Sequence, residues 1–303
     1  MAVKEKTAVN AESIQAVNIV TFKQKMLQYR NHPSSLVLLI LVILCAVITV
    51  GALLFLIAYI LVQGIPNLTP ELFSLEYNSE NASLMPALLN TVLITAISLV
   101  IAVPLGIFAA IYLVEYAKRG NKLVSMVRMT AETLSGIPSI VYGLFGMLFF
   151  VTTLGWGNSL IAGSCTLAIM ILPLIMRTTE EALNTVPDSF REGSFGLGAG
   201  KLRTVFRVIL PTAVPGILSG VILAIGRIVG ESAALIYTAG TIAQYPKDIF
   251  SSTRTLSVHM YLCTNEGLHT SQAYGTAVVL LVLVVIINAL SSFAAKKLTK
   301  KMG

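Results

Sequence analysis

The chain carries little charge for its length. Of 303 residues, 12% are Asp, Glu, Lys or Arg, whereas 55% are hydrophobic. Soluble domains average about 25% charged residues, so this composition excludes a soluble globular protein and indicates one embedded in a lipid bilayer. A span needs about 20 apolar residues, which leaves room for several spans but no second globular domain. We therefore expect one membrane domain over residues 35–303 after a polar tail, residues 1–34.

The chain also has few cysteines and lacks the standard nucleotide-binding motif. The three cysteines are far apart, and Cys45 and Cys165 lie in apolar runs, so no disulfide framework is expected. The run from Gly196 to Lys201 reads GLGAGK, but a phosphate-binding loop needs Gly at Phe195 and Ser or Thr at Leu202. The chain itself is therefore not expected to bind ATP.

Long apolar runs predict six membrane spans. The run over residues 133–176 is interrupted by the turn formers of Gly155–Ser159, which favours a tight hairpin of two spans. The alternative is that two short runs pair as re-entrant segments. Pro104 and Gly106 lie inside the second span and predict a kink there. The remaining runs are Leu36–Val62, Leu84–Val114, Ile217–Tyr237 and Ala273–Ala295.

Basic residues mark the cytoplasmic side. The N-terminal tail, the loops after spans two and four, and the C-terminal tail together hold 18 Lys and Arg, and the opposite side holds only Lys247 and Arg254. Cytoplasmic flanks carry this excess, so both termini are predicted to lie inside. The same clustering at the ends of apolar runs argues against nucleic-acid binding despite the net charge of +7. The first run is about twice the length of a signal-peptide core, so we expect it to remain as an anchor.

The segment from Arg177 to Leu210 is far longer than a connection between adjacent spans requires. Ser189–Glu192 has the form of a capping box with Pro187 just upstream, which predicts a short helix starting there. This helix is expected to end at a group of glycines: Gly196, Gly198 and Gly200.

A second helix is predicted directly after these glycines. It has an apolar face and a basic face, so we expect it to lie on the membrane surface before Pro211 turns the chain inward. The apolar residues are Leu202, Val205, Phe206, Ile209 and Leu210, and the basic residues are Lys201, Arg203 and Arg207.

The same segment resembles the EAA loop of ABC importer permeases, E-A-A-x3-G-x9-I-x-L-P. Glu192-Gly193-Ser194, Gly198, Val208 and Leu210-Pro211 match its spacing at every position. Gly193, Ser194 and Val208 replace two alanines and an isoleucine, which lowers helix propensity slightly but keeps the shape. In that family the helix before the glycine docks into a groove of the ATPase subunit. The resemblance implies the following docking residues in the loop 177–211: Ser189, Glu192, Gly193, Ser194, Gly198 and Pro211. The alternative is an amphipathic surface loop with chance glycines.

Three further stretches are similar to the permeases of the phosphate-specific importer, the PstA type above all. They are residues 135–146, 227–240 and 273–290. The resemblance implies an all-α, type I importer permease in the bacterial cytoplasmic membrane, without catalytic residues or cofactors. It also implies four kinds of partner: a second homologous permease, a homodimeric ABC ATPase that hydrolyses ATP, an extracytoplasmic phosphate-binding protein, and membrane lipid.

Arg227 and Glu231 are the candidate substrate-path residues. Each costs roughly 3 kcal/mol near the centre of a span, which calls for a function. The arginine would offer bidentate donors to an oxyanion, and Ser232 is a weaker candidate for the same path. Alternatively, Arg227 and Glu231, at i and i+4, form an ion pair that only tightens the bundle.

Two other functions remain open at this point. The pair Arg227 and Glu231 would suit a proton-coupled secondary anion transporter, although the loop 177–210 argues against that class. An ABC permease for another oxyanion or small solute would carry the same loop. The polar group His259, Cys263, Glu266 and His269 has spacing compatible with a metal site, but an external loop lying along the membrane surface is the favoured interpretation.

Overall fold

The computed structural model describes residues 33–302 except 79, 119, 266 and 268. All regular elements in this part are helical, which confirms the all-α prediction. The chain divides into two units, Met1–Tyr59 and Ile60–Gly303. The first contains most of helix α2 (Pro33–Gly64), which includes the predicted span Leu36–Val62. Residues 1–32, nearly all of the predicted tail, lie outside the described residues.

In the second unit, helices α3 (Met85–Ile111) and α6 (Leu160–Asn184) pack closely together. Pro104 lies within α3 without ending it, and the helix continues as the π-helical segment η4 (Tyr112–Tyr116). A Cβ atom at Gly106 would lie 2.8 Å from Cγ2 of Ile175 on α6. Glycine is therefore required at position 106 because the two helices approach each other there.

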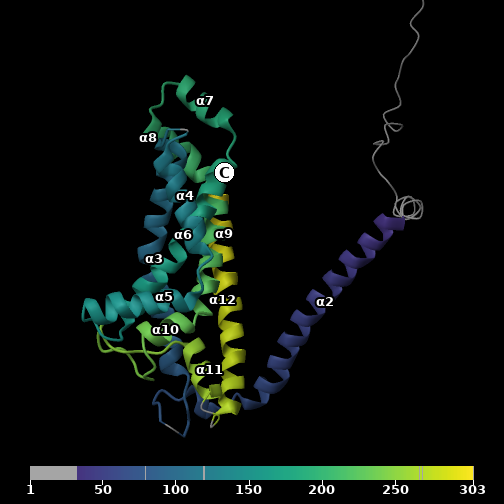
Figure 1. Ribbon diagram of the computed structural model, residues 1–303, viewed down its shortest axis with the longest axis vertical. Coiled ribbons are helices and arrows are strands. Elements are labelled where there is room, and N and C mark those ends of the chain that lie inside the picture. Colours follow the sequence, from purple (N-terminus) through teal and green to yellow (C-terminus); the bar gives the residue numbers. More distant parts are fainter. Residues whose placement is uncertain (1–32, 79, 119, 266, 268, 303) are drawn as a thin grey trace, which may run out of the picture. The chain divides into compact units, whose positions relative to one another are not determined.

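The third apolar run does not form a straight span. Helix α4 (Lys122–Ser135) is followed by α5 (Ser139–Gly146) and the π-helical segment η5 (Met147–Thr153), at an angle of 102° to α4. Figure 1 shows α5 running across the direction of α4 and α6. Pro138 separates the two helices, since it lacks an N–H group and disfavours helical geometry at the residue before it. Among the described residues, five helices are long and apolar enough to span a membrane, or six if this bent pair counts as one span.

The prediction that a separate helix after Gly200 lies on the membrane surface is wrong. Helix α8 (Lys201–Thr204), the π-helical segment η6 (Val205–Ile209) and helix α9 (Leu210–Val229) form one continuous candidate span from Lys201 to Val229. Pro211 does not turn the chain, because it occupies the first turn of α9 directly after the π-helical segment, where a missing N–H is tolerated. The buried residues Val205 and Ile209 pack in the core rather than against lipid headgroups.

The fifth span also ends earlier than Tyr237. Helix α9 stops at Val229, and the short helix α10 (Ala233–Thr238) begins after a break at Gly230–Ser232. The last run forms α12 (Thr270–Met302), which packs against α9 and against α11 (Leu256–Asn265). The connection after α2 contains two short 3₁₀ helices, η2 (Ile65–Asn67) and η3 (Pro70–Phe73).

Candidate functional site: the 177–211 loop and the polar cavity of the span helices

The short helix expected in the loop 177–211 is α7 (Asp188–Gly196). It starts without a capping box: Pro187 is the N-cap residue and no side chain caps the helix. Ser189 therefore lies inside the first turn, exposed. Two other features start the helix, because Pro187 holds an extended backbone just before it and Asp188 places a carboxylate at its positive end.

Helix α7 presents apolar side chains on its surface. Phe190 and Phe195 are 46% and 47% exposed, and Leu197, just after the helix, is 91% exposed. Glu192 and Gly193 are exposed beside them. Exposed apolar groups with a polar rim are typical of a protein–protein contact surface.

The glycine turn after α7 has the geometry that the spacing predicted. Gly198 has φ of +81°, a conformation that L side chains rarely adopt. A Cβ atom added at this position would have no neighbour within 4 Å in the described part of the chain. The requirement for glycine is therefore conformational, not steric. The hydroxyls of Ser194 and Thr204 are 2.8 Å apart and join α7 to α8 across the turn.

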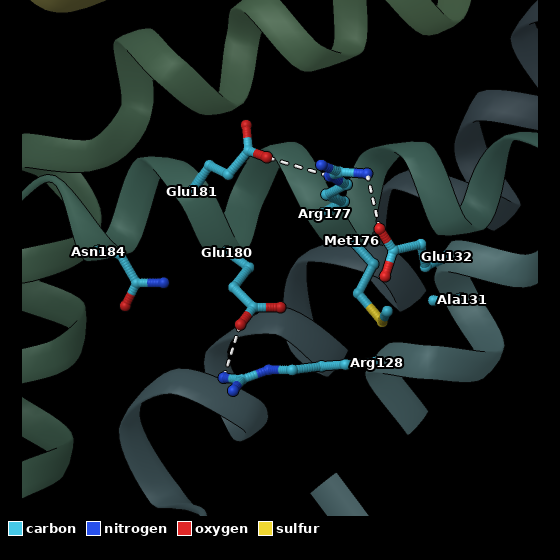
Figure 2. Close-up of a pocket in the computed structure, with 8 residues that line it drawn as sticks. All are labelled: Arg128, Ala131, Glu132, Met176, Arg177, Glu180, Glu181 and Asn184. Carbon is cyan, nitrogen blue, oxygen red and sulfur yellow. Dashed lines mark hydrogen bonds and ion pairs between the residues drawn. The ribbon is translucent and has the colours of Figure 1, made fainter. Parts of the chain in front are cut away.

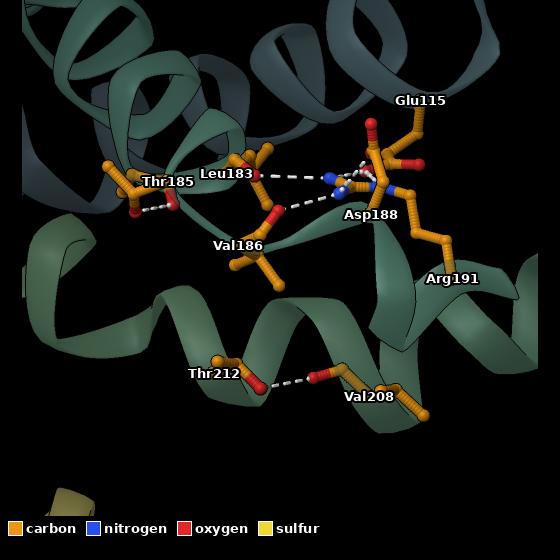
Figure 3. Close-up of polar contacts among 9 residues, drawn as sticks. Glu115, Leu183, Thr185, Val186, Asp188, Arg191, Val208 and Thr212 are labelled. Carbon is orange, nitrogen blue, oxygen red and sulfur yellow. Dashed lines mark hydrogen bonds and ion pairs between the residues drawn. The ribbon is translucent and has the colours of Figure 1, made fainter. Parts of the chain in front are cut away.

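Arg191 anchors α7 to the span helices (Figure 3). Its Nη2 lies 2.7 Å from Oε1 of Glu115 in η4, and its Nε donates to the same oxygen at 3.1 Å. The guanidinium also donates to the carbonyl oxygens of Leu183 (3.1 Å) and Val186 (2.8 Å), at the end of α6. Both side chains are mostly buried, with exposures of 16% for Arg191 and 7% for Glu115. One side chain thus joins the loop to both α3 and α6.

Ion pairs also join α4 to α6 near this end of the bundle (Figure 2). Arg128 Nη2 lies 2.6 Å from Oε1 of Glu180, and Arg177 Nη1 lies 3.9 Å from Oε1 of Glu132. These four side chains and Asn184 line a cavity of about 250 Å³. The Arg177 pair is well exposed, so it contributes little to stability.

Arg227 lies in the last turn of α9 and lines a cavity of about 560 Å³. Leu174 of α6, Ser219 of α9 and Asn288 of α12 line the same cavity. The arginine is half-buried, and the ion pairs among the described residues do not include it.

Glu231 is not the partner of Arg227, although they are four residues apart. The helix ends at Val229 between them, so they do not share a helical face. Oε1 of Glu231 instead accepts a hydrogen bond from the backbone N–H of Ala234 (3.1 Å), in the first turn of α10. Ser232 is the N-cap residue of α10 but makes no capping hydrogen bond. The sequence-based hypothesis of a helical i and i+4 ion pair is therefore wrong.

The candidate metal residues are only partly within the described part of the chain. His259 is buried, with Nε2 3.7 Å from Sγ of Cys263. Among the described residues, no group of three or more His, Cys, Asp or Glu side chains has the arrangement of a metal site. Glu266 lies outside the described residues.

Comparison with known proteins identifies the family. Residues 102–303 match the binding-protein-dependent transport system inner membrane component family. The probable ABC transporter permease protein YqgI of Bacillus subtilis (strain 168) is 34% identical over 277 residues, 86% of this chain and 94% of the relative. The chain belongs to this family.

Two further comparisons refine the family assignment. The permease is 36% identical over 205 residues to phosphate transport system permease protein PstA 1 of Mycobacterium tuberculosis (strain ATCC 25618 / H37Rv), 67% of this chain and 66% of the relative. A chain in the crystal structure of a bacterial alginate ABC transporter, in complex with alginate pentasaccharide-bound periplasmic protein, has the same fold. Its TM-score is 0.66 at 15% identity, over 90% of this chain and 98% of that chain.

The permease is thus a multi-pass inner-membrane subunit of a bacterial ABC importer, of the PstA type. Sequence reasoning missed Glu115, because its partner Arg191 is 76 residues away. It also missed Asn288, although a lone amide directly after the apolar run 277–287 was a usable signal. The orientation with both termini inside stays a prediction.

Proposed function

We propose that this permease is the PstA-type subunit of an ATP-driven phosphate importer. It forms the translocation path with a second homologous permease and docks on a homodimeric ABC ATPase. An extracytoplasmic phosphate-binding protein delivers the substrate, and the permease hydrolyses no ATP itself. The observation that carries the proposal is α7, a short exposed helix with apolar side chains, anchored to two span helices by Arg191.

The ATPase is the partner of the loop 177–211 in this proposal. Ser189, Glu192, Gly193 and Ser194 lie on α7, and Gly198 supplies the turn that follows it. Exposed Phe190, Phe195 and Leu197 supply apolar area for docking in a groove. The second helix predicted in the loop is the start of the candidate span Lys201–Val229, so Pro211 acts within α9 and not in the contact surface.

Phosphate passes Arg227 in this proposal. The guanidinium lines a cavity among span helices and carries two parallel N–H donors, the geometry that suits an oxyanion. Glu231 and Ser232 lie at the break between α9 and α10, just after the C-terminal end of α9. In this proposal they line the same phosphate path as Arg227. The relatives named as phosphate transport permeases support phosphate as the substrate.

The proposal is tested in proteoliposomes that contain the permease with its second permease and ATPase, with the binding protein added outside. We expect uptake of radiolabelled phosphate to require enclosed ATP and the binding protein, and to persist with a protonophore. A matched preparation with a hydrolysis-deficient ATPase should show none. Uptake that a protonophore abolishes while ATP remains would identify a secondary transporter instead, and uptake of a different oxyanion alone would reject phosphate.

A further inference from the structure

The cavity beside Arg227 has an apolar wall and few polar groups. Leu174, Ile222 and Leu223 supply the apolar surface, and the polar side chains are those of Arg227, Ser219 and Asn288. Asn288 lies near the middle of the 33-residue helix α12. A lipid headgroup does not reach the middle of a span, so an anion found there comes from the aqueous phase.

The positive charge in this cavity has no ion-pair partner among the described residues. Arg227 takes part in none of the ion pairs among the described residues, and Glu231 is engaged with the N–H of Ala234. A guanidinium beside apolar walls is costly unless an anion accompanies it. The cavity therefore has the charge expected of an anion site.

Asn288 has unused hydrogen-bonding capacity at the same place. Its Oδ1 is buried without a hydrogen-bond partner. Buried amide groups are nearly always paired, so an unpaired one in the middle of a span calls for a functional explanation. Ser219 differs, because its hydroxyl already donates to the carbonyl of Pro215 at 3.1 Å. Among the polar groups of the cavity wall, Asn288 is thus the one left to join Arg227.

We propose that Asn288 is a ligand of the translocated oxyanion, which it holds together with Arg227 in a cavity of this one permease. The Arg227 guanidinium donates two N–H groups to the charged oxygens. The carboxamide of Asn288 donates one more and can accept from a phosphate hydroxyl, because phosphate near neutral pH keeps at least one proton. This inference rests on the proposed function, since it assigns a second ligand to the same path.

The test compares Asn288→Leu and Asn288→Asp with the wild type in the reconstituted phosphate importer. Both changes keep the side chain close to its original size. In the proposed function a separate binding protein captures the substrate, so we expect the apparent KM to stay unchanged and the maximal rate of uptake to fall tenfold or more in each variant. Asn288→Leu should melt at the same temperature as the wild type or higher, because it removes an unpaired buried oxygen. Ser292→Ala, an exposed change on the same helix, should leave both rate and melting temperature unchanged.

Each alternative outcome has a defined meaning. A wild-type rate in either Asn288 variant overturns the inference. A lower rate that is accompanied by a lower melting temperature or by loss of bound ATPase in both variants also overturns it, because the amide would then be structural. A wild-type importer that takes up no phosphate rejects the proposed function itself, whereas wild-type uptake with equal uptake by Asn288→Leu rejects only the role of Asn288.

Discussion

Glu115 and Arg191 form the main side-chain connection between α7 and the span helices in the described part of the chain. Their carboxylate and guanidinium are 2.7 Å apart, and the guanidinium also donates to the carbonyl oxygens of Leu183 in α6 and Val186 just after it. The pair is mostly buried, so water cannot readily replace it if one partner is lost. A displacement of α7 by a bound ATPase is therefore expected to move α3 and α6 together.

The first prediction concerns this connection. Arg191→Lys keeps the charge but cannot reach Glu115 and two carbonyl oxygens at once. We expect the ATPase to bind, but the phosphate transported per ATP hydrolysed to fall several-fold, with a loss of about 1–3 kcal/mol in unfolding free energy. Coupling is measured as the ratio of uptake to hydrolysis in proteoliposomes.

Arg177→Lys is the matched control for this experiment. Arg177 belongs to two exposed ion pairs, with Glu132 and with Glu181, so its change should cost under about 1 kcal/mol and leave the coupling ratio unaltered. Equal effects of Arg191→Lys and Arg177→Lys would show that the Glu115 pair has no special role in coupling.

The second prediction concerns the turn at Gly198. Gly198→Val should leave the permease inserted but weaken its association with the ATPase, because a β-branched residue is strained at a φ of +81°, by about 1–2 kcal/mol or more. Gly200→Ala, two residues further on, at a φ of −73° and with open space around it, should preserve association. Co-purification of the ATPase with each variant measures this, and normal recovery with Gly198→Val would disprove the docking assignment.

The third prediction concerns orientation, which rests on the 18 to 2 distribution of basic residues. In a background without native cysteines, a cysteine at Asn78 should react with an impermeant maleimide from outside. A cysteine at Lys201 should react only after the membrane is permeabilised. Reversed labelling of the two positions would overturn the predicted topology.

The fourth prediction concerns Arg227. Arg227→Lys should lose most of the uptake because lysine lacks the fork, and Arg227→Gln should abolish it with the ATPase still bound. Adding Glu231→Gln should not restore uptake, because Glu231 is bonded to Ala234 and not to Arg227. Uptake is compared at matched expression, and recovery in the double variant would show that the two charges act as a structural pair.

The fifth prediction concerns pH and His259, which lies in α11 outside the candidate spans. Burial, and to a lesser extent the Arg254 guanidinium, lower the pKa of His259 to about 3. A histidine in the unfolded chain has a pKa near 6.5, so protonation favours the unfolded state once the pH falls below that value. At pH 5 the free energy of unfolding is therefore about 2 kcal/mol lower than at neutral pH. Melting temperatures at pH 7.5 and 5 should therefore differ more for the wild type than for His259→Gln. Equal differences in the two proteins would contradict the burial of a neutral His259.

The sequence predicted the features that depend on local composition. Apolar runs longer than a bilayer is thick must form helices, because no water is present to satisfy the backbone, and this gave α2, α3, α6 and α12. The glycine turn at Gly198 was equally readable, since few other residues adopt its φ. The family resemblance followed from the spacing of residues within one short loop.

Tertiary structure decided the features that depend on distant residues or on backbone breaks. A basic and apolar pattern after Lys201 fits a surface helix or the start of a span, and only packing of Val205 and Ile209 against the core selects the span. The i and i+4 spacing of Arg227 and Glu231 does not place the two side chains on one helical face, because the helix ends at Val229 between them. Sequence alone determined that this chain crosses a membrane and that the loop 177–211 has the spacing of the family's EAA motif. The positions of Glu115 beside Arg191, and of Asn288 in the same cavity as Arg227, arise only when separate helices are packed together.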